Sequence, residues 1–325
     1  MKRRVIIDTD PGIDDALALM LAVRSSELQI EGVTIVPGNV EPQVGAKNAL
    51  RVLDVAGADY IPVFLGAKAP LYRKLVPAMR IHGKDGLGDC NWPQTNRSVV
   101  NSCAIQYMID QAHHFPKELT LICLGPLTNL ALAIRQDPEA MALYQEIVIM
   151  GGAARVAGNV SPVAEFNFWS DPEAAHMVFE WSKIPLIVIG LDVTKQTLLR
   201  PTHREFLKHV NTPLATWICR LTRHYLNIHW ELDSILGCML NDPLAVAVTF
   251  MPELVTLQNY TLDVATDGLC RGQMVVDYSG QWRKRNNARI ATEVDAQTFI
   301  EEFLVRLVPE KYSVQELRKH FAQNC

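Results

Sequence analysis

The chain has 325 residues, of which 49% are hydrophobic and 20% charged, a composition typical of a folded protein with a large buried core. Its 31 basic and 35 acidic side chains give a formal net charge of -4, which argues against a nucleic-acid-binding protein. No apolar run is as long as a membrane span, and the basic start MKRR leads directly into VIID, so we expect neither a membrane segment nor a signal peptide.

Short apolar runs rich in β-branched residues alternate with helix-like stretches in the first part of the chain. The runs are VIID, VTIV, IPVFLG, LTLICLG, IVIMGG and PLIVIGLD, and segments such as DDALALMLAV and NLALAIRQ lie between them. This alternation predicts an α/β fold, a single-domain open and mostly parallel sheet with helices on both faces.

The pattern changes between about residues 201 and 237, where helical stretches carry aromatic residues and histidines (TWICRLTRHYLNIHWELD). We interpret this segment as a helical insertion or lid near the site. Further on, YTLDVATDGLCRGQMVVDYSG predicts a strand pair and FIEEFLVRLV an amphipathic helix. With no repeat or clear linker, residues 1–325 are expected to form one domain.

The seven cysteines are scattered along the chain, odd in number and without a C-x-x-C pair. Such spacing favours reduced cysteines in a cytoplasmic protein over a disulfide framework or a zinc site.

Polar clusters follow the strand-like runs: DTDPG, PGN, LGPLTN, MGGAA and GLDVT. In open α/β sheets, ligands bind beyond the carboxyl ends of the strands. Turn formation explains any one of these loops, but the whole set, together with the aspartates of the first loop, indicates a binding site.

The stretch DTDPGIDD places four aspartates within eight residues. Asp14 and Asp15 fall in the first turn of a helix predicted from Ile13, where the backbone favours negative charge, and helix capping accounts for one or two of the four. The remaining carboxylates repel each other, and a hard divalent cation relieves that repulsion. Ca²⁺ accepts six to eight oxygen ligands, whereas Mg²⁺ uses fewer protein ligands in stricter geometry.

Together with GPLTNLA, MGG, EFNFWSDPEAA, GLDVT and NDPLAVA, the segment DTDPGIDDA resembles the nucleoside hydrolase family of the inosine–uridine-preferring type. The resemblance covers nearly the whole chain. It implies an open α/β domain that holds Ca²⁺ at the carboxyl ends of the strands and hydrolyses ribonucleosides to ribose and free base. It also implies a homodimer or homotetramer that acts in nucleoside salvage on a small-molecule substrate.

The same resemblance implies a role for each carboxylate. The Ca²⁺ ligands would be the carboxylates of Asp10, Asp15 and Asp242 and the carbonyl of Leu124, with Asp8 supporting the loop from behind. Asp14 would act as the general base that takes a proton from a metal-bound water. Direct attack by this water predicts inversion at the anomeric carbon.

A further set of residues is expected to contact the substrate. By resemblance, the ribose contacts would be Asn39, Asn159, Glu165 and Asn167, with Met150 and Phe166 also in the substrate site. If the EFN segment is extended, Glu165 and Asn167 share one face while Phe166 points away. Without the family, turn formation would be the preferred explanation for Asn39 and Asn159.

The leaving-group side departs from the family pattern. His82, in RIHGKDGLGD, corresponds to the family's HGxxGL histidine, and its role is either catalytic or structural. Most well-known members carry a histidine directly before the last metal aspartate, where this chain has Asn241. An amide can hydrogen-bond to a base but cannot deliver a proton.

Three explanations remain open for this difference. In the first, another group protonates or polarises the base: His82, His224, Tyr225 or His229. In the second, the substrate carries a base that leaves with little acid help. Alternatively, the protein is a weak hydrolase or a nucleoside- or ribose-binding relative, since losing a general acid typically costs about 10²–10⁴-fold in rate. Tyr225 and His229, four residues apart, can share one helix face, and the alternative interpretation of both is that they are core residues.

A haloacid-dehalogenase-like phosphohydrolase is a less favoured alternative, because DTD after a first strand resembles the nucleophile loop of that family. That family usually has Thr or Val two residues after the second aspartate, where this chain has Gly12, and no later lysine motif is evident.

Overall fold

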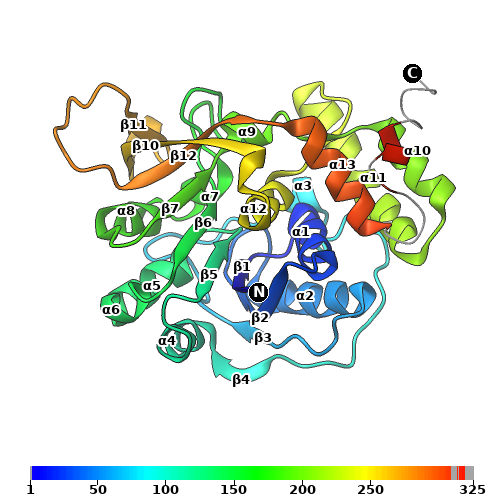
Figure 1. The fold of residues 1–325 in the computed structure, drawn as a ribbon, viewed down its shortest axis with the longest axis horizontal. Coiled ribbons are helices and arrows are strands. Elements are labelled where there is room, and N and C mark those ends of the chain that lie inside the picture. The colour runs from blue at the N-terminus through cyan, green and yellow to red at the C-terminus, as the bar shows by residue number, and fades with distance from the viewer. Residues whose placement is uncertain (1, 309–312, 314, 319–325) are drawn as a thin grey trace.

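One long sheet runs through the molecule in the computed structural model, which describes residues 2–308, 313 and 315–318 (Figure 1). Its strands lie in the order β11-β10-β12-β7-β6-β5-β1-β2-β3-β4. Their bounds are β1 Arg3–Thr9, β2 Leu28–Ile35, β3 Val63–Leu65, β4 Val100–Cys103, β5 Leu119–Cys123, β6 Glu146–Met150, β7 Leu186–Ile189, β10 Val255–Val264, β11 Met274–Asp277 and β12 Ala288–Val294. Strands from β12 to β4 pair in parallel, whereas β10 is antiparallel to both β11 and β12. The predicted α/β class and open, mostly parallel sheet are confirmed.

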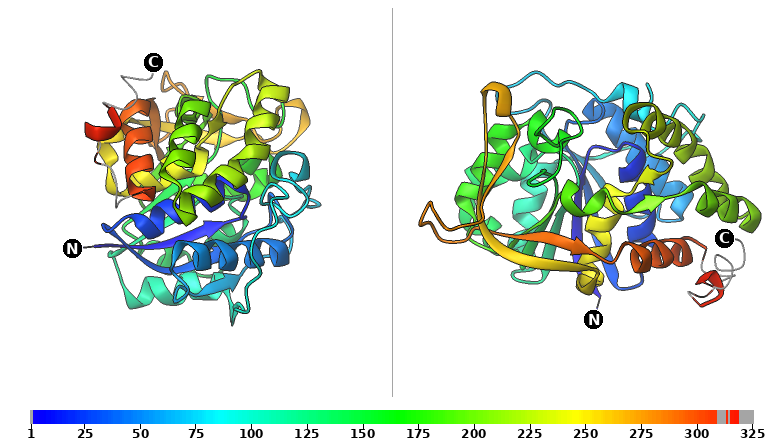
Figure 2. Two further views of the ribbon diagram at one scale, coloured as in Figure 1. Left: turned by 90° about the vertical axis from the view of Figure 1, so that its right-hand side faces the viewer. Right: turned by 90° about the horizontal axis from the view of Figure 1, so that it is seen from above.

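Helices cover both faces of this sheet (Figures 1 and 2). On one face lie α1 (Ile13–Arg24), α2 (Pro42–Ala56), α12 (Asn241–Phe250) and α13 (Ala296–Leu307); on the other lie α4 (Ala104–His114), α5 (Thr128–Gln136), α6 (Pro138–Met141) and α8 (Pro172–Trp181). Successive side chains of a strand point to opposite faces, so Val5 and Ile7 of β1 join one apolar cluster and Ile6 joins the other. The sheet is therefore buried on both sides, as its continuous apolar runs predict.

Helix α1 follows β1 after the short turn Asp10–Gly12 and is buried along almost its whole length. All its residues from Ile13 to Ala22 are buried, because the helix packs against α2 and α12. A helix that is apolar all round belongs in a protein interior. This burial fixes the first turn of α1, and with it Asp14 and Asp15, at the carboxyl edge of the sheet.

The predicted helical insertion corresponds to α10 (Pro201–Val210) and α11 (Pro213–Asp233), which lie side by side at one edge of the molecule (Figures 1 and 2). The small sheet of β8 (Leu198–Leu199) and β9 (Cys238–Met239) joins the two ends of the insertion. Helix α11 contacts α1 and the short helix α3 (Met79–His82), which places it over the carboxyl edge of the main sheet.

The remaining elements are short. They are α7 (Phe166–Ser170), α9 (Leu191–Thr194) and the 3₁₀ turns η1 (Pro252–Leu254) and η2 (Gly268–Cys270). The expected strand pair is β10 with β11, and the expected amphipathic helix is α13. Within the described residues, no helix is both long and apolar enough to cross a membrane.

Six of the seven cysteines lie in the described residues, and all six are free thiols. The expectation of unpaired cysteines therefore holds for this part of the chain. Cys325 lies outside the described residues.

Candidate active site

Several loops at the carboxyl edge of the sheet enclose one pocket with a volume of ≈ 430 Å³. The loops follow β1, β2, β5 and β6, and the opposite wall comes from α3 and α11. Thirteen of the residues singled out from sequence line it: Asp14, Asn39, His82, Leu124, Met150, Asn159, Glu165, Phe166, Asn167, Tyr225, His229, Asn241 and Asp242. Asp10 and Asp15 are fully buried beside this lining.

Four aspartates come together at the base of the pocket. Carboxylate oxygens of Asp14, Asp15 and Asp242 lie within 4.8 Å of one another. Asp10 adjoins them; its Oδ2 accepts a hydrogen bond from the backbone N–H of Asn39 (2.6 Å), whereas its buried Oδ1 has no partner among the described residues. No lysine or arginine in the described chain forms an ion pair with any of the four.

The electrostatics of this cluster favour uptake of positive charge. Burial raises the pKa of all four carboxyls, and for Asp10, Asp15 and Asp242 the neighbouring carboxylates raise it further. A buried carboxylate without a cation or a proton is strongly disfavoured. Oxygen-only ligands with an unpartnered buried oxygen are the donor set that hard divalent cations use, so the residues present fit such an ion.

Two glycines explain how the Asp10 carboxylate fits into so small a space. A Cβ at Gly38 would lie 1.9 Å from Asp10 Oδ2, and one at Gly125 would lie 2.5 Å from Asp10 Oδ1. Because real Cβ contacts are never this short, only glycine allows the backbone to approach Asp10 from both sides.

Asp8 lies behind the pocket. Its Oδ1 accepts hydrogen bonds from Thr34 Oγ1 (2.7 Å) and Asn129 Nδ2 (2.8 Å). Burial raises the pKa of Asp8 to about 7, while these two donors oppose the rise. The side chain thus ties β1 to β2 and α5, consistent with the supporting role expected for it.

Asp14 belongs to the cluster, lines the pocket and is hydrogen-bonded to Asn241. The amide Nδ2 of Asn241 donates a hydrogen bond to Asp14 Oδ2 (3.1 Å). Burial raises the pKa of Asp14, and the Asn241 amide and the Tyr225 hydroxyl oppose this rise.

The EFN segment is not extended, so the expectation that Glu165 and Asn167 share one face of an extended segment, with Phe166 pointing away, is wrong. Phe166 begins α7, and Glu165 is its N-cap residue, whose carboxylate accepts hydrogen bonds from the backbone N–H of Asn167 (2.9 Å) and of Phe168 (3.3 Å). A carboxylate at this position satisfies N–H groups that have no partner within the helix. Glu165 and Asn167 still both line the pocket, and so does Phe166.

Glu165 and Asn167 are held rigidly by the backbone around them. Glu165 Oε2 also accepts from the Gly152 N–H (3.0 Å), and burial raises the pKa of Glu165 to about 7. Asn167 Nδ2 donates to the carbonyl of Leu124 (2.8 Å) and lies 3.2 Å from that of Met150. Asn159, on the exposed rim, accepts from the Phe166 N–H through its Oδ1 (2.9 Å).

Aromatic and histidine side chains form the other half of the pocket. His82 Nδ1 accepts a hydrogen bond from the Ile13 N–H (3.0 Å), so the proton of the neutral ring is on Nε2. The Tyr225 ring centroid lies 5.8 Å from that of His82 and 4.2 Å from that of His229. Burial lowers the pKa of both His82 and His229 to about 4, so both rings are neutral near pH 7. His224 is not part of the pocket lining and instead contacts the carbonyl of Arg80 through Nε2 (3.1 Å).

The apolar side chains at the rim of the pocket were not predicted from the sequence. Val76, Ile81, Trp169, Ile228 and Leu232 all line it. Helical spacing was a usable signal for two of them, because Ile228 and Leu232 follow Tyr225 by three and seven residues on one face of α11. Nothing in the local sequence marks Val76, which lies in an irregular segment before α3.

An acidic cluster beneath a polar and aromatic pocket, at the carboxyl edge of a mostly parallel sheet, forms a binding site for a small polar molecule. The family model for inosine-uridine preferring nucleoside hydrolases matches residues 5–301. A probable uridine nucleosidase 2 from Arabidopsis thaliana is 35% identical over 94% of this chain and 98% of its own length. A pyrimidine-specific ribonucleoside hydrolase RihA from Klebsiella pneumoniae is 37% identical over 93% of this chain and 97% of its own.

Solved structures give the same result. The plant nucleoside hydrolase PpNRh1 superposes with a TM-score of 0.92 at 33% identity, over 95% of this chain and 99% of that one. A purine-preferring ribonucleoside hydrolase from Gardnerella vaginalis superposes with a TM-score of 0.89 at 32% identity, over 94% and 98% of the two chains. The chain belongs to the nucleoside hydrolase family, and it is an N-glycosidase by class. The suspected family is thereby confirmed, and the phosphohydrolase alternative loses its support.

Proposed function

We propose that this protein hydrolyses the N-glycosidic bond of ribonucleosides, releasing ribose and the free base, in a calcium-dependent reaction in which Asp14 activates the attacking water. The observation that carries the proposal is the arrangement of one pocket: a carboxylate cluster at its base, hydrogen-bonding side chains along one wall and aromatic side chains along the other. A ribonucleoside has the matching distribution of hydroxyl groups and a flat base.

Asp10, Asp15, Asp242 and the carbonyl of Leu124 would hold the cation. The unpartnered Oδ1 of Asp10 and the absence of basic partners in the described chain support this assignment. Ca²⁺ is preferred to Mg²⁺ because the donors are all protein oxygens in a crowded cluster. When bound, such a cation supplies an electrophile that acidifies a water and anchors ribose hydroxyls.

Asp14 would accept the proton from the attacking water. In support of this role, Asp14 lines the pocket, and the Asn241 amide orients its carboxylate by donating to Oδ2. Direct attack on the anomeric carbon passes through an oxocarbenium-like transition state and inverts the configuration.

The ribose would contact Asn39, Asn159, Glu165 and Asn167. Glu165 and Asn167 are both nearly fully buried and are held by backbone hydrogen bonds, so they are organised before the substrate binds. A substrate lacking a hydroxyl would leave such groups unpaired at a cost of about 1–3 kcal/mol each. Met150 and Phe166 would pack against the sugar and the base.

The base would lie among His82, Tyr225 and His229, where it can be polarised by hydrogen bonds. Both histidines are neutral near pH 7, so neither carries a ready proton as an imidazolium ion. The Nε2–H of His82 remains a hydrogen-bond donor, because its Nδ1 is occupied by the Ile13 N–H. This environment suits a base that leaves with the help of hydrogen bonds rather than by full protonation. Uridine is the first substrate to test, because the relatives are named a uridine nucleosidase and a pyrimidine-specific ribonucleoside hydrolase.

Asn241 supports one alternative, a nucleoside- or ribose-binding relative with weak or altered hydrolase activity. Here the pocket would bind a nucleoside, but the bond would break slowly because no acid faces the base. Assembly as a homodimer or homotetramer, a cytoplasmic location and a place in nucleoside salvage stay predictions.

A panel of ribonucleosides separates these functions. Uridine, cytidine, inosine and ribosides with unusual bases are incubated with the protein, with and without a chelator, and the released reducing sugar is measured. The hydrolase predicts sugar release that the chelator abolishes and Ca²⁺ restores. Binding of a nucleoside without sugar release would favour the binding relative, whereas phosphate release from phosphomonoesters alone would overturn the proposal.

A further inference from the structure

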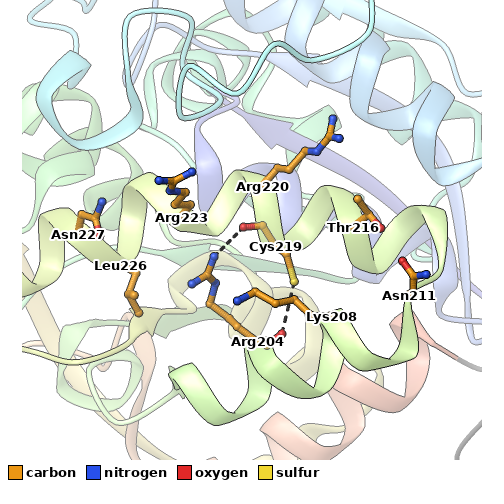
Figure 3. A pocket seen from close by; sticks show the side chains of 9 residues that line it. All are labelled: Arg204, Lys208, Asn211, Thr216, Cys219, Arg220, Arg223, Leu226 and Asn227. Carbon is orange, nitrogen blue, oxygen red and sulfur yellow. Dashed lines mark hydrogen bonds between the residues drawn. The ribbon is translucent and has the colours of Figure 1, made fainter.

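A second cavity, of ≈ 590 Å³, lies between α10 and α11, away from the pocket described above (Figure 3). Its lining residues repeat at helical spacing on both helices, and they are Arg204, Lys208, Asn211, Thr216, Cys219, Arg220, Arg223, Leu226 and Asn227. We refer to it as the α10–α11 groove. Four of its nine lining side chains are cationic and none is acidic.

Arg204 is the most unusual member of the groove, because only 9% of it is exposed. Its Nε donates to Thr222 Oγ1 (2.9 Å) and its Nη2 donates to the carbonyl of Cys219 (2.7 Å), both of them uncharged acceptors. Within the described chain no carboxylate forms an ion pair with it. A guanidinium has five N–H donors, so this buried cation has donors to spare and no counter-charge.

Of the other three cations of the groove, one is paired with a carboxylate and two are not. Lys208 pairs with Glu205, which lies three residues earlier on the exposed side of α10. Arg220 lies over the ring of Trp217 with its Cζ 4.8 Å from the centroid, and neither Arg220 nor Arg223 has an ion-pair partner in the part of the chain described. In Figure 3, Arg204 and Lys208 lie between the two helices, whereas Arg220 and Arg223 project from the side of α11 that is turned away from α10.

We propose that the α10–α11 groove binds the phosphate group of a small phosphorylated ligand. Guanidinium groups recognise phosphate through paired, charge-assisted hydrogen bonds, and Arg204 is already fixed in place by its two bonds to protein oxygens. The amides of Asn211 and Asn227 and the hydroxyl of Thr216 add neutral polar groups at the groove walls. The cavity volume leaves room for a ligand larger than the phosphate itself.

The groove is connected to the active-site pocket through α11. Arg220 and Arg223 project from one face of this helix, whereas Tyr225 and His229 on another face line the active-site pocket. An anion that braces α11 against α10 would therefore restrain the wall on which we place the nucleobase. Occupancy is expected to change the KM for a nucleoside more than kcat.

Isothermal titration calorimetry on the Ca²⁺-loaded protein tests this directly, with inorganic phosphate, pyrophosphate and glycerol 3-phosphate as probes and KCl at matched ionic strength as reference. The variants are Lys208→Glu, whose side chain lies between the two helices, and Arg223→Glu on the groove lining; both residues are exposed, so the substitutions leave the core intact. Arg285→Glu, an equally exposed arginine outside the groove, is the control for net charge. Arg204→Gln is added as the buried variant, with circular dichroism to verify that it folds.

The proposal predicts saturable phosphate binding that weakens by about tenfold or more in each groove variant and stays unchanged in Arg285→Glu, a loss equivalent to one charge-assisted hydrogen bond. Tighter binding of glycerol 3-phosphate than of inorganic phosphate would identify a phosphate ester as the ligand, and the reverse order would identify free phosphate. Equal responses to phosphate and KCl, or binding that survives both charge reversals, would overturn it. Sedimentation data showing that the charge reversals only dissociate an oligomer would also overturn the proposal, because a second copy of the chain would then cover the groove.

Discussion

Asn241 and Asp14 lie 227 positions apart in the sequence, and the Asn241 amide donates a hydrogen bond to the Asp14 carboxylate over 3.1 Å. An ionised carboxylate only accepts hydrogen bonds, so the amide nitrogen must face Asp14 and Oδ1 must turn away from it. Oδ1 is buried without a partner among the described residues. Asn241 therefore orients the proposed general base and leaves an acceptor free for an N–H or O–H group of the substrate.

Replacing Asn241 by histidine should change the relative rates on uridine and inosine. The imidazole would remove the free amide oxygen and bring a titratable group next to the base, which an amide cannot provide. The ratio of kcat/KM for the two nucleosides measures the effect. If no nucleoside responds to the substitution, Asn241 does not face the leaving group.

Asp14→Ala should reduce kcat by about 10²–10⁴-fold, the range expected when a general base is lost. Asp10, Asp15 and Asp242 remain in this variant, so bound metal should persist. Steady-state kinetics are paired with metal analysis of the dialysed protein. Turnover like that of the unaltered protein would rule Asp14 out as the base, and a loss of the metal would make it a ligand instead.

Gly38→Ala should weaken metal binding without unfolding the protein. Its new Cβ would lie 1.9 Å from Asp10 Oδ2, so the carboxylate must move. Gly237→Ala is the matched control, because the nearest atom to its Cβ lies at 3.4 Å, an ordinary contact. Calcium titration of both variants checks this, and equal affinities would argue against Asp10 as a ligand.

The metal-free protein should lose stability as the pH rises, and added Ca²⁺ should remove that loss. Burial raises the folded-state pKa of the four aspartates of the cluster above the ordinary value of about 4, so the folded protein binds more protons than the unfolded chain. This stabilisation is fully present at a pH below the pKa values of the unfolded chain, and it is lost as the pH rises through the pKa values of the folded protein. A bound cation replaces those protons.

Thermal unfolding at about pH 5.5 and pH 8, with chelator and with Ca²⁺, measures this linkage. The rise in Tm on adding Ca²⁺ should be larger at the higher pH. An equal rise at both values would mean that the cation does not bind at the aspartate cluster.

The periodicity of the sequence predicted the fold class and six strands of the main sheet, because the six apolar runs correspond to β1, β2, β3, β5, β6 and β7, whereas β4 and β12 were not predicted. Asp14 and Asp15 were placed correctly in the first turn of α1, because a strand, a Pro-Gly turn and an apolar helix leave little freedom. The EFN segment was misjudged because α7 has only five residues, too few to show a helical period, and because Glu165 was interpreted as a ribose ligand in an extended segment rather than as the N-cap of a helix. Contacts such as Asn241 with Asp14 depend on the packing of α12 against α1, which local sequence does not encode.

The central claim is that a water activated by Asp14 attacks the anomeric carbon of a ribonucleoside directly. Proton NMR of uridine mixed with the Ca²⁺-loaded protein follows base release and the configuration of newly formed ribose in the same spectra. Since the substrate is a β-nucleoside, we expect free uracil together with α-ribose, which precedes the β-anomer in the earliest spectra. If β-ribose forms first, the reaction proceeds with retention, which would contradict direct attack. If uridine and the other ribonucleosides stay intact, the proposed hydrolysis itself is contradicted.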